Sequence, residues 1–200
     1  MCRKGVYVRS TAFKVRGEWS KEAVAEIKKS EHIALCHWWE DYLQDRSLFG
    51  KRTIEAVRPK FPEWITRTHG SLNYYMSQLF TGHGSFGHFL FGIRKRTDES
   101  CPHCGNDSDT VEHTLQTCPA WAEERTQLIA MIGPVEERAL TMEFVVGAIL
   151  GSERLWIAFA NFAREVIKSK EDEERRRRQR SPIVFNPLPG HPGRGQTDEL

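Results

Sequence analysis

Four side chains that commonly bind zinc lie close together in the middle of the sequence. Two residues separate Cys101 from Cys104, His113 follows, and Cys118 comes shortly after it. Three thiolates and one imidazole form a ligand set that zinc takes in tetrahedral sites. Because protein fills all four positions, no place remains for a reacting water, and we expect one structural zinc ion. His103 is an alternative to His113, although it lies between two ligands in a tight turn.

The residues around these ligands favour a backbone that brings them together. Pro102 stiffens the first turn, and Gly105 relaxes the chain after it. Asp109, with Glu112 three residues later, has the pattern of a capping box. We therefore expect Asp109 to begin the short helix that carries His113.

A regular helix cannot place Cys118 beside His113. Five residues along an α-helix rotate a side chain about 140° away from the first. Pro119 disfavours helical geometry at the residue before it. The sequence therefore predicts that this helix ends between the two ligands, so that their side chains can converge.

The other two cysteines, Cys2 and Cys36, are interpreted as bystanders. The N-terminus has no signal-peptide pattern, and the longest apolar run, residues 144–150, is too short to span a bilayer. In a reducing compartment, clustered cysteines are more often metal ligands than disulfides. We expect an intracellular protein in which these cysteines bind metal instead of forming disulfides, and we expect no membrane partner.

The elements that position the ligands are predicted to be helices. Apolar residues recur at helical spacing through most of the chain, which indicates a mainly α fold: a helical bundle with a small Cys-Cys-His-Cys knuckle and a disordered C-terminal tail. In the first helix, capped by Ser20, Trp38 and Trp39 are expected to pack in the core. The expected helices cover residues 20–42, 53–58, 71–80, 85–96, 120–131, 142–150 and 152–167.

Composition divides the chain into five parts. A basic segment that we interpret as continuing from an upstream domain is followed by a helical region, the knuckle, further helices, and a charged helix extension with a disordered tail. These parts cover residues 1–19, 20–97, 98–121, 122–170 and 171–200.

The charged extension has acids followed four residues later by arginines, from Glu171 to Arg178. This order stabilises an isolated helix, so we expect a solvated helix extension. Arg175–Arg180 as a nuclear-localisation or RNA-binding patch is the alternative.

The first half of the chain carries a net positive charge, and the second half a net negative one. Arg94, Lys95 and Arg96 close a predicted helix just before the knuckle and are candidates for phosphate contacts. Phe91 falls off the apolar row of that helix and is a candidate for stacking on a base. His83 lies in a glycine-flanked turn, where contact with a phosphate and stabilisation of the turn are both open.

Several of these motifs occur together in a known family. The tyrosine-rich segment from Tyr74, the turn Thr81-Gly82-His83-Gly84, and the Cys-Cys-His-Cys set with Pro119 resemble the C-terminal end of insect non-LTR retrotransposon reverse transcriptases. The resemblance covers about residues 35–135. It implies that Cys101, Cys104, His113 and Cys118 bind Zn²⁺, and that the region follows a polymerase domain and positions nucleic acid. In that family the whole protein nicks target DNA and copies its RNA onto the nicked end.

The chain departs from this family in two respects that matter for activity. A reverse transcriptase needs metal-binding aspartates, typically in an aromatic-x-Asp-Asp motif, and this sequence contains no Asp-Asp pair. No endonuclease-like set of residues or Walker motif is present either. We expect a fragment, a truncated element or a derived gene that is not itself an enzyme.

Two hypotheses about function follow. The first is a zinc-stabilised nucleic-acid-binding accessory module, which acts in the nucleus on RNA or DNA during RNA-directed DNA synthesis and target-site integration. The alternative is a zinc-stabilised helical interaction module that docks on a polymerase domain. Neither hypothesis involves a small-molecule substrate.

Overall fold

The computed structural model describes residues 20–45, 49–133 and 140–180. These ranges contain helices and loops but no strand, which confirms the predicted mainly α class. The basic segment 1–19 and the predicted disordered tail from residue 181 lie outside them. None of the described helices is long and apolar enough to cross a membrane. In chain order the helical elements are α2 (Lys21–Tyr42), α3 (Lys51–Val57), η1 (Arg58–Lys60), α4 (Phe61–Thr66), α5 (Tyr74–Thr81), α6 (Gly87–Gly92), η2 (His113–Thr117), η3 (Pro119–Trp121), α7 (Ala122–Ile132), α8 (Met142–Leu150) and α9 (Glu153–Arg180).

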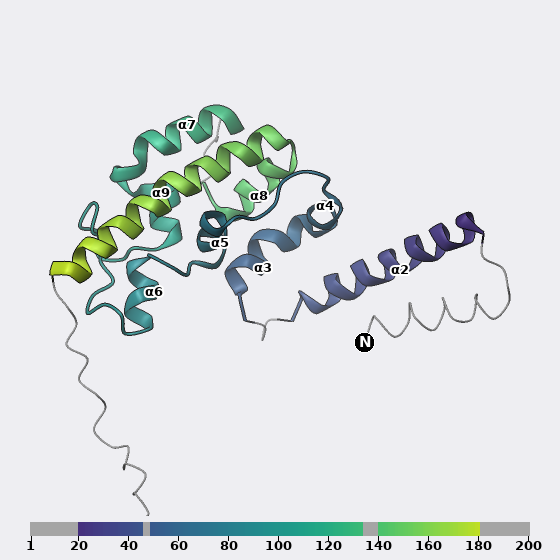
Figure 1. Ribbon diagram of the computed structural model, residues 1–200, viewed down its shortest axis with the longest axis horizontal. Helices are drawn as coiled ribbons and strands as arrows, with labels where there is room; N and C mark the ends of the chain where they lie inside the picture. The colour runs from purple at the N-terminus through teal and green to yellow at the C-terminus, as the bar shows by residue number, and fades with distance from the viewer. Residues whose placement is uncertain (1–19, 46–48, 134–139, 181–200) are drawn as a thin grey trace, which may run out of the picture.

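The long helix α9 lies at the centre of the fold and packs against α5, α7 and α8 (Figure 1). Ser152 begins it as predicted, since its hydroxyl accepts the Leu155 N–H at 3.3 Å. An apolar stripe along α9, within the predicted helix 152–167, supplies much of the core. However, burial does not stop at Ile167, because Lys170 and Glu174 are also buried on the same face. The buried apolar residues of the stripe are Trp156, Phe159, Phe162, Ala163, Val166 and Ile167.

The prolines between α3 and α4 redirect the helical path instead of ending it. Pro59 and Pro62 each fall at the start of a new helical segment, where a missing N–H costs nothing. The resulting α3–η1–α4 unit packs against α5 and α8. It buries Ala56, Val57 and Phe61 in the main core.

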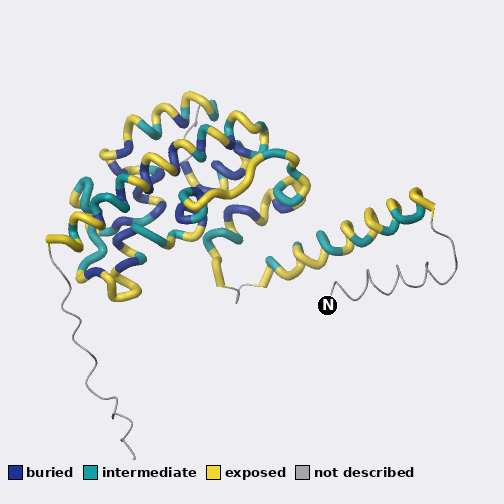
Figure 2. Tube along the Cα trace, viewed as in Figure 1, coloured by how far each residue is buried: buried dark blue, intermediate teal, exposed yellow. Residues whose placement is uncertain are grey.

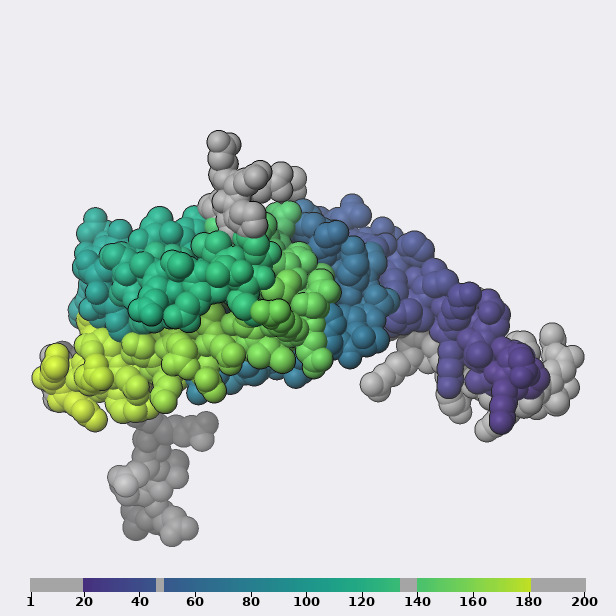
Figure 3. Space-filling view, turned by 90° about the horizontal axis from the view of Figure 1, so that it is seen from above, coloured from purple at the N-terminus to yellow at the C-terminus, as the bar shows by residue number. Residues whose placement is uncertain are grey.

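Helix α2 extends away from the rest of the molecule (Figures 1 and 3). Ser20 caps it as predicted, accepting the Ala23 N–H at 3.0 Å. No residue of α2 is buried (Figure 2), and Trp38 and Trp39 are 50% and 39% exposed. The prediction that these two side chains pack in the core is therefore wrong. Leu43, just after the end of α2, packs against the core. Leu35, Cys36 and Trp39 line a pocket with residues of α3 and α4, but none of the three is buried.

Helix α6 begins differently from the prediction. Phe86 occupies the N-cap position, and Ser85 provides no side-chain cap. The Gly87 N–H instead donates to the Asp109 carboxylate at 3.0 Å. A Cβ on Gly87 would lie 2.6 Å from the Glu99 carbonyl oxygen, so glycine is required for this close approach. The knuckle loop thereby provides the cap of α6.

Candidate metal centre and the neighbouring surface

The four predicted ligand atoms converge on one point. The sulfurs of Cys101, Cys104 and Cys118 and one ring nitrogen of His113 all lie within 4.8 Å of one another. The Cys101 and Cys118 sulfurs are 3.9 Å apart, and the Cys104 sulfur is 3.2 Å from His113 Nε2. In a tetrahedral site with Zn–S bonds of ~2.3 Å, two sulfurs are separated by about 3.8 Å. The arrangement fits a zinc ion held by four protein ligands.

The first two ligands sit on a tight turn. The Gly105 N–H donates to the Cys101 carbonyl at 2.8 Å, and the Cys101 N–H donates to the Asn106 carbonyl at 2.8 Å. Gly105 has a φ of 78°, in the left-handed region that favours glycine. This geometry accounts for the glycine directly after Cys104.

The other two ligands meet through a wide helical turn. The Cys118 N–H donates to the His113 carbonyl at 2.8 Å, which closes the π turn η2. A turn closed by an i to i+5 bond returns residues five apart to the same side. Cys118 itself is extended, with φ −60° and ψ 116°, as the following Pro119 favours. The predicted helix break is present, but the sequence did not predict the π turn.

The predicted cap of this short helix is wrong. Thr110, and not Asp109, accepts the His113 N–H, at 3.1 Å from its hydroxyl oxygen. Glu112, expected to complete a capping box, forms an ion pair with Arg52 on α3. Because the neighbouring Thr110 accepts the His113 N–H, the Asp109 carboxylate does not cap this helix.

Asp109 forms a buried ion pair with Lys170 of α9. Both side chains are almost fully buried, with 0% and 1% of their surface exposed. The Lys170 ammonium also lies 5.0 Å from the ring centre of Phe86 and 6.0 Å from that of Trp121. This pair joins the knuckle loop to the central helix. In the sequence, Lys170 comes three residues after Ile167, a spacing that places both on the same face of a helix.

Outer contacts orient two of the ligands. His113 Nδ1 lies 3.1 Å from the Thr117 hydroxyl, an arrangement that leaves Nε2 for the metal. The Arg125 guanidinium donates to the carbonyl oxygens of Cys118 and Thr114, at 2.6 and 3.2 Å. Neither Thr117 nor Arg125 was singled out from the sequence, because both act through the folded backbone.

The surroundings disfavour free thiolates at two of the cysteines. Burial, together with the charge of Asp109, raises the pKa of the Cys101 thiol to about 12. Burial also raises the pKa of Cys118. A metal cation is therefore needed to hold both sulfurs as thiolates, and its binding must release protons.

The pKa values of the other two ligands, Cys104 and His113, are shifted in the direction that favours metal binding. Burial lowers the pKa of His113, which favours the neutral imidazole that binds metals. Burial opposes ionisation of Cys104, but the Asn106 N–H and the neighbouring thiols outweigh it and lower its pKa. His103 is not among the converging atoms, and its ring packs 4.7 Å from that of Trp121.

The candidate nucleic-acid-binding residues differ in their exposure. Arg94 and Lys95 are exposed, and Phe91 is 48% exposed at the end of α6. His83 is exposed and stacks on Phe89 with ring centres 4.5 Å apart. Arg96 points inward.

The guanidinium of Arg96 has internal partners. Its side chain is 3% exposed, and it donates to Asp98 at 2.9 Å and to the Ser100 carbonyl at 3.0 Å. It therefore supports the knuckle loop and does not present its charge to a phosphate.

The charged extension of α9 is attached to the body instead of being solvated throughout. Glu171 accepts hydrogen bonds from Tyr74 and Gln78 of α5, and Arg177 pairs with Asp98 at 3.2 Å. Among the predicted acid–arginine pairs four residues apart, Glu174–Arg178 forms. The remaining exposed pairs join residues three apart: Asp172–Arg175 and Glu173–Arg176.

Comparison with known proteins gives one informative similarity. Over 101 residues the chain is 31% identical to the retrovirus-related Pol polyprotein from type-1 retrotransposable element R1 4 of Nasonia vitripennis. The chain is similar to part of a retrotransposon Pol polyprotein. The aligned region makes up 50% of this chain and 24% of that protein. No protein-family model and no solved structure matches the chain.

Proposed function

We propose that this chain is a zinc-stabilised accessory module of a retrotransposon reverse transcriptase, and that it binds nucleic acid without catalysing a reaction. The convergence of Cys101, Cys104, His113 and Cys118 supports the zinc ion. Four protein ligands give that ion a structural role. The similarity to a Pol polyprotein supports the retrotransposon context.

Exposed cations next to the knuckle support contact with nucleic acid. Neither Arg94 nor Lys95 forms a side-chain ion pair within the described ranges, so both charges are available to phosphates. Arg94 has a φ of 59°, which turns the chain sharply away from α6 toward the knuckle loop. Phe91 and the His83–Phe89 stack provide aromatic surface on the same stretch. Cations combined with exposed rings are typical of proteins that bind single strands.

A salt titration tests this proposal. The zinc-loaded chain is titrated with labelled single-stranded RNA, single-stranded DNA and duplex DNA at several salt concentrations. We expect binding that weakens steeply with salt, and we expect Arg94→Gln/Lys95→Gln to reduce the slope of log K against log salt by about 1.5. Phe91→Ala should weaken single-strand binding by about 1–3 kcal/mol.

The matched control replaces two exposed cations elsewhere, Lys21→Gln and Lys168→Gln. This control should leave the slope within error of the unmodified protein. No binding to any of the three probes at low salt would exclude the nucleic-acid role.

Helix α2 favours a second candidate, in which the module docks on a polymerase domain. Trp38, Trp39 and Tyr42 form an aromatic cluster on it, and they are 50%, 39% and 42% exposed. Exposed clusters of this kind mark protein contacts. We expect Trp38→Ala/Trp39→Ala to abolish co-purification with a co-expressed retrotransposon polymerase domain. Phe91→Ala, an exposed aromatic on another element, is the control and should retain the domain.

A further inference from the structure

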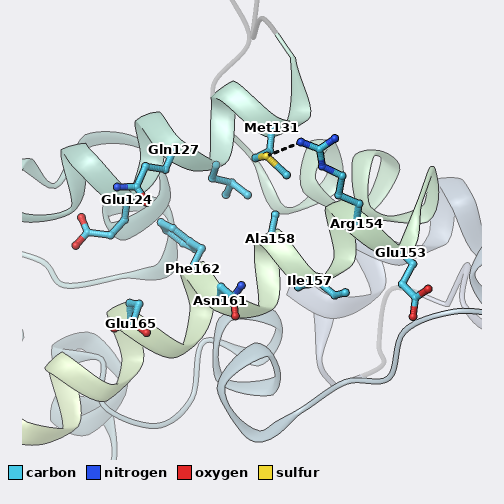
Figure 4. Close-up of a pocket in the computed structure, with 11 residues that line it drawn as sticks. Glu124, Gln127, Met131, Glu153, Arg154, Ile157, Ala158, Asn161, Phe162 and Glu165 are labelled. Carbon is cyan, nitrogen blue, oxygen red and sulfur yellow. Dashed lines mark hydrogen bonds between the residues drawn. The ribbon is translucent and has the colours of Figure 1, made fainter.

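A groove runs between α7 and α9, and no residue of the metal centre lines it. Its volume is about 570 Å³. Figure 4 shows the side chains that line it. Both helices contribute side chains to it, and the two lie along one another over this part of the surface (Figure 3).

The floor of this groove is apolar and so are parts of its rim. Leu128 and Phe162 form the floor and are 2% and 5% exposed. Met131 and Ile157 lie on the two sides and are 36% and 53% exposed, although both are large and apolar. An apolar floor with exposed apolar edges loses free energy in water and gains it when a partner covers it.

The charges around the groove are mainly negative. Glu124 comes from α7, and Glu153 and Glu165 come from α9. Glu165 is partly neutralised by Arg164, at 3.1 Å. Arg154 is the single cation among the lining residues. Its guanidinium lies 3.6 Å from the Met131 sulfur, and a dashed line marks this contact in Figure 4. The surplus of carboxylates repels nucleic acid and attracts a cationic partner.

We propose that the α7–α9 groove binds a basic amphipathic helix of a partner protein. Such a helix places apolar side chains, spaced three and four residues apart, over Leu128 and Phe162. Its lysines and arginines then face Glu124, Glu153 and Glu165. The partner would complete a three-helix layer with α7 and α9. This binding is separate from the proposed nucleic-acid binding, because carboxylates line the groove whereas Arg94 and Lys95 are the cations proposed to contact phosphates.

A peptide titration tests the groove. The probe is a fluorescein-labelled helical peptide of about 15 residues, with leucines on one face and lysines elsewhere. We expect saturable binding to the zinc-loaded protein. Ile157→Asp should weaken binding at least ~10-fold, because it places a charge at the apolar rim. Glu124→Gln/Glu153→Gln should weaken it about 3- to 10-fold at low salt and less at high salt.

Each variant has a matched control at a distant exposed site. Ile33→Asp on α2 introduces the same change at a residue that is 47% exposed, and Glu26→Gln/Glu143→Gln removes two carboxylates outside the groove. Both controls should bind the peptide as the unmodified protein does. Circular dichroism checks that every variant folds.

Three results would overturn the proposal. The first is equal binding of a peptide with glutamates in place of the lysines, and the second is binding that Ile157→Asp leaves unchanged. The third is a dimer of the protein alone that Ile157→Asp dissociates, which would assign the groove to a second copy. None of these results depends on RNA or DNA binding, and Ile157→Asp should leave that binding intact.

Discussion

Thr117 fixes the orientation of the His113 ring from the far side of the metal centre. Its hydroxyl is 3.1 Å from Nδ1. Partners of this kind select the tautomer of a histidine ligand and hold its ring in place. The same π turn that joins His113 to Cys118 carries Thr117, so ligand and support come from one short segment.

We predict that Thr117→Val lowers zinc affinity without unfolding the protein. Valine keeps the shape of threonine but cannot bond to Nδ1, and losses of this kind typically cost about 10- to 100-fold in metal affinity. Competition with a chromophoric zinc chelator measures the change. Thr126→Val, which removes an exposed threonine hydroxyl from α7, is the control and should leave the affinity unchanged.

Asp98 has a carboxylate that the fold strongly favours in its charged form. A hydrogen bond from Ser100 is the largest cause, and the charges of Arg96 and Arg177 add to it, so the pKa of Asp98 falls to about 2. Its ordinary value in an unfolded chain is about 3.9. Because the folded value is the lower one, the carboxylate stabilises the fold above pH ~4, and this contribution is lost as pH falls toward ~2.

We therefore predict that Asp98→Asn destabilises the protein near pH 7 and has a smaller effect near pH 3. Urea unfolding of both proteins at each pH gives the two differences in free energy of unfolding. An effect of equal size at both pH values would show that the charge of Asp98 is not its cause.

At the scale of elements, the Asp109–Lys170 pair is a fully buried link between the knuckle and α9. Elsewhere on α9 apolar side chains such as Val166 and Ile167 are fully buried and hold the helix to the core. At Lys170 a buried ion pair makes the contact. Removing one member of a buried pair leaves an unpaired charge in the interior, which typically costs about 3–5 kcal/mol. The Gly87 N–H stabilises the same carboxylate and extends the link to α6.

We predict that Lys170→Met lowers the free energy of unfolding by about 3–5 kcal/mol. Asp109→Asn should cost less in the Lys170→Met background than in the unmodified protein, since the charge it removes is then already unpaired. Urea unfolding of the two single variants and the double variant completes the cycle. Lys168→Met, an exposed position of the same helix, should change stability by less than about 0.5 kcal/mol.

At the scale of the whole molecule, the metal ligands are part of the main core. Cys101 and Cys118 belong to the same buried cluster as Phe80, Val145 and Phe159. A site that shares its core with the remaining helices should not unfold separately from them. Zinc should therefore stabilise the helical body as well as the knuckle.

We predict that a zinc chelator lowers the Tm of the whole helical body in a single transition. A loss of several kcal/mol corresponds to a fall of about 10 °C or more for a chain of this size. Far-ultraviolet circular dichroism and tryptophan fluorescence should report the same midpoint. Separate transitions, with the helical signal unchanged by the chelator, would show that the knuckle is an independent unit.

The sequence by itself determined the features that depend on neighbouring residues. The ligand set could be read from residue type and spacing, and Pro119 indicated the break before it. The cap at Ser20 and the register of α9 followed from local hydrogen bonding and from helical periodicity. Both are properties of a short stretch of chain.

Only the tertiary structure decided which partner each side chain meets. Asp109 binds Lys170 because α9 passes beside the knuckle, and Arg96 turns inward because its guanidinium donates hydrogen bonds to Asp98 and the Ser100 carbonyl. Trp38 has the same helical spacing as a core residue, yet it is 50% exposed, and its ring packs on Trp39 and Tyr42 of its own helix. Periodicity shows which face of a helix is apolar, whereas burial also requires a second surface, and distant parts of the chain supply that surface.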